Sequence, residues 1–369
     1  MGGMRVLIAA GGSGGHIFPA IALARTLKEE DKDISIKFVG GNRALDRRIF
    51  EKEGFDFTLI SANKLFYGIS WSSAVFAVKL ALDLVRSFFI MISYRPDVVV
   101  GFGGYVSFPV ILSGRVCGRS VIVHEQNVAP GRANKVLFKL ADKVAVSFDE
   151  TRRFMGPHAI KAVFTGNPIR REIFEDDKDL GLSRFGLSRN KSTILVIGGS
   201  QGAHFLNEQF IAGMSKVDPA ARSSIQVIHL TGVQDYEWAD RAYKSLKGLE
   251  YRVYSFIDRI EEAYSASDLI VSRSGASALF EIAFFGRPMI LVPYPFAMSH
   301  QAENAMAFSE KGAAIKIDEN ALSGDVFKDV ITRLLKDKEQ LKRLGDAAKR
   351  LSVPEASENL AREVLGLIK

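Results

Sequence analysis

A glycine-rich loop that ends in a histidine lies near the start of the chain. The loop, "GGSGGH", spans residues 11–16, after an apolar run at 6–10 and before another at 17–24. Glycine lets backbone N–H groups approach an anion closely, and a following helix directs its positive end to the same place. The loop therefore predicts a phosphate site, with tight packing of a strand against a helix as the alternative.

Two further loops of this kind follow apolar runs along the chain. "VVVGFGGY" occupies residues 98–105, and "ILVIGGSQGA" occupies residues 194–203. Three such loops, two of which open separate halves of the chain, favour phosphate binding at a topological switch point over packing alone.

The sequence lacks several motifs that bind particular phosphate ligands, and their absence excludes some classes of ligand. The dinucleotide fingerprint fails because Ile17 stands where a third glycine belongs, and residues 40–42 supply no carboxylate for a ribose. A Walker A loop is excluded because there is no Gly-Lys pair. We expect no metal site, since Cys117 is the single cysteine and the six histidines form no H-E-x-x-H pair. Asp177 and Asp179 lie in a charged run that we expect to be a solvated loop.

Short runs rich in valine and isoleucine alternate with helical patterns through both halves of the chain. This alternation predicts the α/β class, with two doubly wound Rossmann-like domains whose parallel sheets carry helices on both faces. We expect an N-terminal domain over residues 1–166, a C-terminal domain over 167–352, and a last helix over 353–369 that packs back on the N-terminal domain. The expected strands are residues 6–10, 34–39, 98–100, 121–124, 143–146 and 162–164, then 193–197, 226–230, 251–254, 269–271, 289–292 and 314–317.

Positive charge is concentrated in the first half of the chain. The net charge is +7, and residues 1–169 hold 22 Lys+Arg against 14 Asp+Glu, a balance of +8. Such an excess suits nucleic acid, an anionic membrane or a phosphate-bearing substrate. No zinc-ligand pairs and no RNP-type aromatic strand occur, so we expect no nucleic-acid partner.

The apolar stretch at residues 71–93 is long enough to span a bilayer. However, Lys79, Asp83 and Arg86 fall four and three residues apart, on one helix face, and such charges oppose spanning. We expect an amphipathic helix that lies against the core or partly in a lipid interface, with an ordinary packed helix as the alternative. The apolar run at the N-terminus is too short for a signal peptide, which predicts a cytoplasmic protein.

Eight short motifs, in one order, carry a resemblance to a known family. Together they resemble the MurG family of bacterial peptidoglycan N-acetylglucosaminyltransferases, which add GlcNAc from UDP-GlcNAc to the MurNAc 4-hydroxyl of lipid I and so make lipid II. The resemblance implies two Rossmann-like domains with a cleft between them (the GT-B fold), inversion at the anomeric carbon, and neither a metal nor another cofactor. The motifs are "GGSGGH", "GFGGYVSFP", "HEQNVAPG", "GNPIR", "GGSQGA", "FID", "SRSGASALFE" and "HQAENA".

The resemblance places the nucleotide sugar mainly on the C-terminal domain. Ser200 would bond the diphosphate, and the backbone of Ile257 would bond the uracil. Glu281 would accept from both ribose hydroxyls, which suits a carboxylate facing a cis diol. Arg170 would lie near the nucleotide at the hinge, and Gln301 would contact the GlcNAc hydroxyls. The other expected donor contacts are Ala276, Ser277, Ala278, Leu279 and Phe280, with Ser13, Gly14, Gly15 and Asn127 from the N-terminal domain.

The same resemblance places the acceptor on the N-terminal domain, against His16, Gly103, Gly104 and Tyr105. At the entrance of a helix the positive dipole favours a neutral imidazole, which can take a proton from the attacking 4-hydroxyl. His16 is therefore our candidate base, and Glu125 of "HEQN" is its rival. In the remaining alternative, His16 only orients the loop or an acceptor phosphate.

The implied setting is the cytoplasmic face of the bacterial inner membrane, where the protein would bind peripherally. The expected partners are UDP-GlcNAc, lipid I, anionic lipid, and other proteins of cell-wall synthesis and division. Two other functions stay open: a UDP-GlcNAc 2-epimerase, which shares the fold and the donor, and a noncatalytic subunit that binds a nucleotide sugar. An epimerase would need neither the apolar stretch at 71–93 nor the "GFGGYVSFP" loop.

Overall fold

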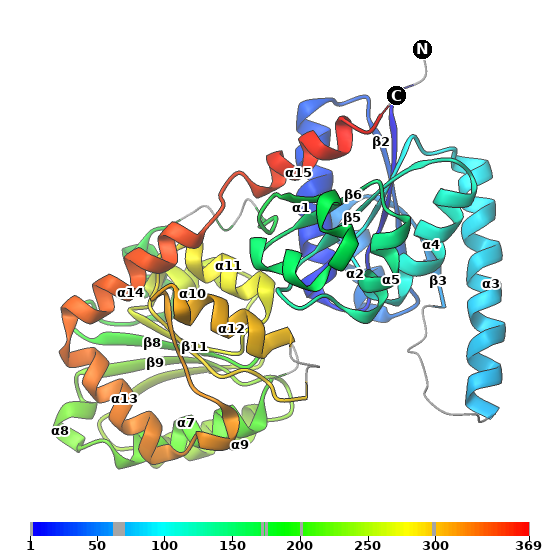
Figure 1. Ribbon diagram of the computed structural model, residues 1–369. Coiled ribbons are helices and arrows are strands. Elements are labelled where there is room, and N and C mark those ends of the chain that lie inside the picture. Colours follow the sequence, from blue (N-terminus) through cyan, green and yellow to red (C-terminus); the bar gives the residue numbers. More distant parts are fainter. Residues whose placement is uncertain are drawn as a thin grey trace. The chain divides into compact units, whose positions relative to one another are not determined.

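The chain divides into two compact units, each built on a parallel sheet (Figure 1). Unit 1 comprises Met1–Arg170 and Val353–Lys369, and unit 2 comprises Arg171–Ser352. The computed structural model describes residues 3–61, 71–170, 173, 176–199, 202–296 and 300–368, without the side chains of 71–74 and 76. The predicted α/β class with two Rossmann-like sheets is confirmed.

In the described part of unit 1, the sheet has seven parallel strands in the order β3-β2-β1-β4-β5-β6-β7. Helices cover both faces, and the middles of the central strands are accordingly apolar and buried, as in residues 6–9 of β1, 98–101 of β4 and 121–123 of β5. The strand register places Ala9, Gly101 and Val123 side by side at the carboxyl ends of β1, β4 and β5. The strands are β1 (Arg5–Ala9), β2 (Ser35–Gly41), β3 (Asp56–Ile60), β4 (Val98–Gly101), β5 (Ser120–Glu125), β6 (Lys143–Val146) and β7 (Ala162–Phe164).

The helices of unit 1 include one from the end of the chain. Helix α15 (Ala356–Leu365) lies beside α1, and its Leu360 and Val364 join the core that β1 and α1 share (Figure 1). The other helices are α1 (Gly14–Glu30), α2 (Ala44–Glu53), α3 (Trp71–Tyr94), α4 (Gly104–Val116), α5 (Arg132–Leu140), and the 3₁₀ turns η1 (Asp149–Phe154) and η2 (Gly156–Lys161).

The described part of unit 2 has a sheet of six parallel strands in the order β10-β9-β8-β11-β12-β13. They are β8 (Ser192–Ile197), β9 (Ile225–Leu230), β10 (Glu250–Tyr254), β11 (Leu269–Ser272), β12 (Met289–Leu291) and β13 (Ala314–Lys316). The helices are α6 (Lys178–Phe185), α7 (His204–Lys216), α8 (Pro219–Arg222), α9 (Tyr236–Lys244), α10 (Ile260–Ala266), α11 (Ala276–Phe284), α12 (His300–Glu310), η4 (Glu319–Ala321), α13 (Gly324–Lys336) and α14 (Lys338–Leu351).

Each predicted strand is present, with its ends shifted by no more than two residues. One strand was missed: β3 lies at an edge of its sheet and alternates polar with apolar residues, so it lacks the continuous apolar run of its neighbours. Asp177 and Asp179 are exposed to solvent as predicted, but the predicted loop is wrong because helix α6 begins at Lys178. The Asp177 carboxylate accepts a hydrogen bond from the backbone N–H of Leu180 at 3.0 Å and caps helix α6.

Helix α3 lies along the outside of unit 1, next to α4 (Figure 1). The predicted charged stripe on this helix is wrong, because Asp83 is buried and accepts a hydrogen bond from the backbone N–H of Ser61 at 2.8 Å. The exposed surface of α3 is mostly apolar, although Lys79 and Arg86 are exposed on it as well. None of the helices in the described residues is long and apolar enough to cross a membrane. We call the following residues the α3 apolar face: Val75, Val78, Leu82, Val85, Phe88, Phe89 and Ile92.

Candidate active site

The first glycine loop is held by a buried carboxylate. Asp46, near the start of α2, accepts hydrogen bonds at Oδ2 from the backbone N–H groups of Gly12 (3.0 Å) and Gly41 (2.9 Å). A Cβ on Gly11 would lie 2.6 Å from that same oxygen, so only glycine fits there. Sequence reasoning missed Asp46. The signal for it is an acidic residue in the first turn of the helix that follows a second glycine pair.

Helix α1 begins directly after this loop and carries the predicted residues of the first motif. Ser13 is exposed and precedes the helix, and its carbonyl accepts from the backbone N–H of His16 at 3.1 Å. Gly14 and Gly15 form the first residues of the helix, where N–H groups point toward the N-terminus. The His16 ring is half-buried in the same first turn.

The second glycine loop lies against the first. Gly103 and Gly104 have φ angles of +88° and +73°, which favour glycine. A Cβ on Gly104 would lie 3.5 Å from the His16 ring carbon Cδ2, so the two loops meet at this histidine. Tyr105 follows in the first turn of α4, with 37% of its surface exposed. The structure therefore brings together His16, Gly103 and Gly104, three of the predicted acceptor residues.

The loop that follows β5 is held in place by Glu125. This carboxylate is buried and accepts four hydrogen bonds. Oε1 accepts from the backbone and side-chain N–H groups of Asn127 (2.9 and 3.1 Å), and Oε2 accepts from Gly131 N (3.1 Å) and Asn134 Nδ2 (2.8 Å). These hydrogen bonds engage the lone pairs of both carboxylate oxygens. This geometry disfavours Glu125 as a base and gives it the task of holding the loop and the Asn127 amide.

His124 and Gln126, which stand on either side of Glu125 in the "HEQN" motif, connect this loop to His16. Gln126 Oε1 lies 3.1 Å from His16 Nδ1, and Gln126 Nε2 lies 3.0 Å from His124 Nδ1. Burial lowers the pKa of His124 to about 4, so its ring is neutral near pH 7. Sequence reasoning assigned no role to Gln126 or His124, because the burial and pairing of two polar side chains cannot be recognised from their spacing in the sequence.

In unit 2, the predicted donor residues lie around the N-terminal half of α11. Glu281 is buried, and its Oε2 accepts a hydrogen bond from the hydroxyl of Tyr264 at 3.0 Å. The backbone of Ala276 opens the helix, and Ser277 and Ala278 are half-buried there.

The expectation that the whole segment 276–281 lines a site is wrong for two side chains. Leu279 is fully buried, and Phe280 packs against Phe308 in the core with ring centroids 6.0 Å apart. An α-helix turns its residues to different faces, so a six-residue run cannot all face one ligand.

The remaining predicted residues lie on other elements and loops. Ile257 is half-buried between β10 and α10. The Gln301 side chain accepts from the backbone N–H of Tyr294 at 2.9 Å, and so pins the loop after β12. Arg170, the last residue of the first segment of unit 1, stacks its guanidinium over the Phe18 ring at 4.5 Å from the centroid. Ser200 lies outside the described residues.

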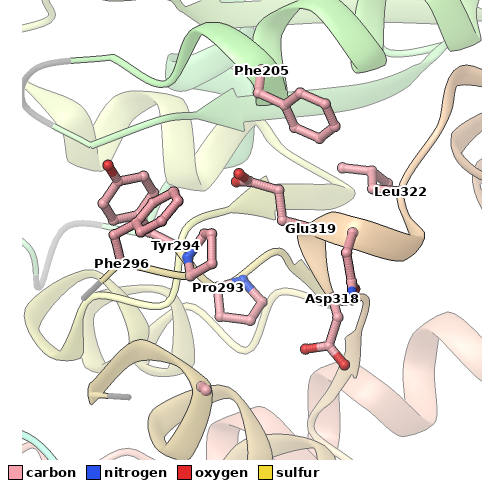
Figure 2. A pocket seen from close by; sticks show the side chains of 10 residues that line it. Phe205, Pro293, Tyr294, Phe296, Asp318, Glu319 and Leu322 are labelled. Atoms are coloured by element: carbon pink, nitrogen blue, oxygen red, sulfur yellow. The ribbon is translucent and has the colours of Figure 1, made fainter. Parts of the chain in front are cut away.

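Unit 2 also contains a cavity of about 620 Å³ at the carboxyl ends of β12 and β13. Figure 2 shows Phe205 and Tyr294 on opposite sides of it, with Glu319 between them. The Tyr294 and Phe296 rings meet edge to face, and Glu319 pairs with the buried Arg273 at 2.5 Å. Sequence reasoning missed this cavity, whose signal is the pair of aromatic residues shortly after β12. Its size is that of a small-ligand pocket.

Within the part of the chain that the structure describes, no group of three or more His, Cys, Asp or Glu side chains is placed to hold a metal ion.

Both halves of the chain match one family of enzymes. Residues 6–146 match the glycosyltransferase family 28 N-terminal domain, and residues 193–360 match the family's C-terminal domain. Among solved structures, the crystal structure of Acinetobacter baumannii MurG has a TM-score of 0.77 at 25% identity, over 99% of both chains. A UDP-GlcNAc 2-epimerase from Neisseria meningitidis has a TM-score of 0.71 at 13% identity, over 98% of this chain and all of its own, which shows the shared fold alone. The fold and the glycine loops thus define a two-domain glycosyltransferase.

Curated relatives narrow the class further. Proteins from Thermodesulfovibrio yellowstonii and Halothermothrix orenii are 37% and 36% identical, over 99% and 97% of this chain and the same shares of their own. Both are named UDP-N-acetylglucosamine–N-acetylmuramyl-(pentapeptide) pyrophosphoryl-undecaprenol N-acetylglucosamine transferase. The chain belongs to glycosyltransferase family 28 and, within it, to the MurG family.

The hydrogen bonds of Glu125 predict a structural phenotype. Glu125→Gln replaces one accepting oxygen by an N–H₂ group that faces other donors, so we expect the free energy of unfolding to fall by about 1–3 kcal/mol. Urea unfolding compared with Glu51→Gln, an exposed carboxylate on α2, measures this. Unchanged stability combined with lost activity would contradict the bracing role and restore Glu125 as a candidate base.

Proposed function

We propose that this chain transfers GlcNAc from UDP-GlcNAc to the MurNAc 4-hydroxyl of lipid I, making lipid II in peptidoglycan synthesis. The observation that carries the proposal is its similarity, from end to end, to relatives named for this transfer. The meeting of two glycine loops at His16 supports it, because the reaction needs a base beside groups that hold a phosphorylated acceptor.

The proposed reaction is a single displacement at the anomeric carbon. His16 removes the proton from the 4-hydroxyl as that oxygen bonds to C1 of GlcNAc. The bond between C1 and the diphosphate breaks, UDP leaves with the bonding electrons, and the configuration at C1 inverts. His16 then carries the proton as an imidazolium, which solvent can deprotonate.

Unit 2 holds the donor in this proposal. The glycine loop after β8 and the N-terminus of α7 supply N–H groups for the diphosphate, without a metal. Glu281 accepts from the ribose hydroxyls, held in place by Tyr264. Ile257, Ala276, Ser277 and Ser200 complete the donor contacts as predicted from the resemblance.

The experiment that tests the function separates it from its two alternatives. The protein is incubated with UDP-GlcNAc alone and with a lipid I analogue, each with and without a chelator. We expect UDP release and a disaccharide product only when the acceptor is present, and no effect of the chelator. A product from UDP-GlcNAc alone would indicate the epimerase, and UDP-GlcNAc binding without any turnover would indicate a noncatalytic subunit.

The role of His16 gives a first prediction for this function. His16→Ala removes the proton acceptor but keeps the backbone donors, so the single-turnover rate should fall by about 10²–10⁴ while UDP-GlcNAc affinity stays the same. His158→Ala, in a turn of the same unit, is the matched control. If the rate is near normal, His16 is not the base. Weaker acceptor binding with an intact rate would assign it to orienting the acceptor.

The role of Glu281 gives a second prediction. Glu281→Ala should weaken UDP-GlcNAc binding by about 1.5–3 kcal/mol, because charge-assisted hydrogen bonds to the ribose are lost. Calorimetric titration measures this loss, with the exposed Glu339→Ala on α14 as the control. A variant that keeps both its fold and its full donor affinity would remove the ribose assignment.

We further propose that unit 1 binds peripherally to the anionic cytoplasmic face of the bacterial inner membrane, through the α3 apolar face. The exposed fractions of Val78, Val85 and Phe89 are 61%, 53% and 64%, and Lys79 and Arg86 are exposed on the same helix. A helix with exposed apolar and basic residues suits an interfacial position. Partners among other proteins of cell-wall synthesis and division stay a prediction from the resemblance.

Mixed apolar and electrostatic binding predicts a salt-sensitive interaction with anionic vesicles. Binding should weaken as salt rises, since the Debye length shortens to about 3 Å near 1 M, and Phe89→Glu should weaken it at every salt concentration. Vesicle sedimentation measures both effects, with Val233→Glu on unit 2 as the control because Val233 is 80% exposed. Two results would contradict membrane binding through the α3 apolar face. One is vesicle binding that does not change with salt concentration, and the other is an equal loss of binding in Phe89→Glu and Val233→Glu.

A further inference from the structure

We propose that Gln126 is a positioning residue that decides which ring nitrogen of His16 carries the proton. In this proposal the Gln126 side-chain oxygen holds the hydrogen on Nδ1, so that Nε2 carries the lone pair that accepts the substrate proton. The inference deepens the function proposed above and rests on it only for its catalytic consequence. The tautomer itself is a property of the protein alone.

The first step is the orientation of the Gln126 amide. Its Nε2 lies 3.1 Å from the carbonyl oxygen of Phe102 and 3.3 Å from that of His124. Both oxygens only accept hydrogen bonds, so a flipped amide would place an oxygen against two oxygens. The side chain is 2% exposed, and buried polar atoms are matched in stable proteins. The amide therefore presents Oε1 to His16 and its N–H₂ group to the interior.

His124 leads to the same orientation independently. Its Nε2 lies 3.2 Å from the carbonyl oxygen of Gly166, which can only accept, so Nε2 carries a hydrogen. Complete burial keeps this ring neutral near pH 7, which leaves its Nδ1 as an acceptor. Gln126 Nε2 lies 3.0 Å from that Nδ1 and must be the donor.

The consequence for His16 follows from the same rule. Gln126 Oε1 lies 3.1 Å from His16 Nδ1 and can only accept, so Nδ1 is the donor. A neutral imidazole has one N–H, so the lone pair resides on Nε2. That nitrogen lies beside Gly104, where a Cβ would come within 3.8 Å of it. The hydrogen-bond chain runs from the Gly166 carbonyl through His124 and Gln126 to His16.

The direct test is the tautomer of His16 in the wild-type protein. Long-range ¹H–¹⁵N spectra of histidine-labelled protein, without substrates, assign the protonated nitrogen of each neutral ring. We expect His16 to be protonated at Nδ1 and His124 at Nε2, with the His16 signals assigned by their loss in His16→Ala. A His16 ring protonated at Nε2 would overturn the proposal.

A kinetic test separates positioning from general support of the fold. Gln126→Leu removes the acceptor, so we expect the single-turnover rate to fall about tenfold or more, with the KM for UDP-GlcNAc unchanged. In the His16→Ala background the same substitution should cost no further rate, because it acts through His16. Gln340→Leu on α14 is the control.

The outcomes distinguish this inference from the proposed function. Equal losses of rate in the two backgrounds would overturn positioning through His16. If Gln126→Leu does not fold, the wild-type spectrum still decides the proposal. A wild-type protein with the Nδ1–H tautomer but no transfer to a lipid I analogue would refute the function and leave the tautomer assignment standing.

Discussion

The parallel pairing of β1, β4 and β5 is the constraint on which the rest of unit 1 depends. Ala9, Gly101 and Val123 lie in one row across these strands, so the chain leaves all three at the same edge. The backbone then continues the alignment, because Phe102 N donates to the Ala9 carbonyl at 2.9 Å. Loops from distant parts of the sequence thus meet at His16, as expected for the carboxyl edge of a parallel sheet.

The buried carboxylates of this edge hold loops, and the base that we propose is a histidine. Asp46 holds the backbone of the first glycine loop, and Glu125 holds the backbone of the loop after β5. A carboxylate whose oxygens already accept hydrogen bonds from the protein has fewer lone pairs left for a substrate proton. His16 has a different environment, because it is half-buried and its Nδ1 faces the side-chain amide oxygen of Gln126.

The sequence predicted the sheets well, because buried parallel strands are short, apolar and rich in branched residues. It missed β3, whose alternating residues at an edge resemble a loop or a surface strand. The motifs also indicated the loops that meet at His16. They did not separate Glu125 from Gln126, since adjacent polar residues differ in role only through their hydrogen bonds in three dimensions.

Other differences have similar physical origins. Leu279 and Phe280 lie in a motif associated with ligand binding, but helix geometry turns their side chains into the core. Asp83 was predicted to share a charged helix face with Lys79 and Arg86, yet it is buried and accepts a hydrogen bond from the backbone N–H of Ser61. Most of the cavity beside Tyr294 is lined by segments after β12 and β13, which are distant from the glycine motifs in the sequence, and only Phe205 closely follows a glycine loop.

The central claim is that His16 Nε2 receives the proton of the acceptor hydroxyl. The most direct measurement is a crystal structure of the protein with UDP and a lipid I analogue that cannot react. We predict the MurNAc 4-hydroxyl within about 2.6–3.2 Å of His16 Nε2, the reach of a general base. A 4-hydroxyl bonded to Glu125 or to another base, with His16 out of reach, would contradict the account.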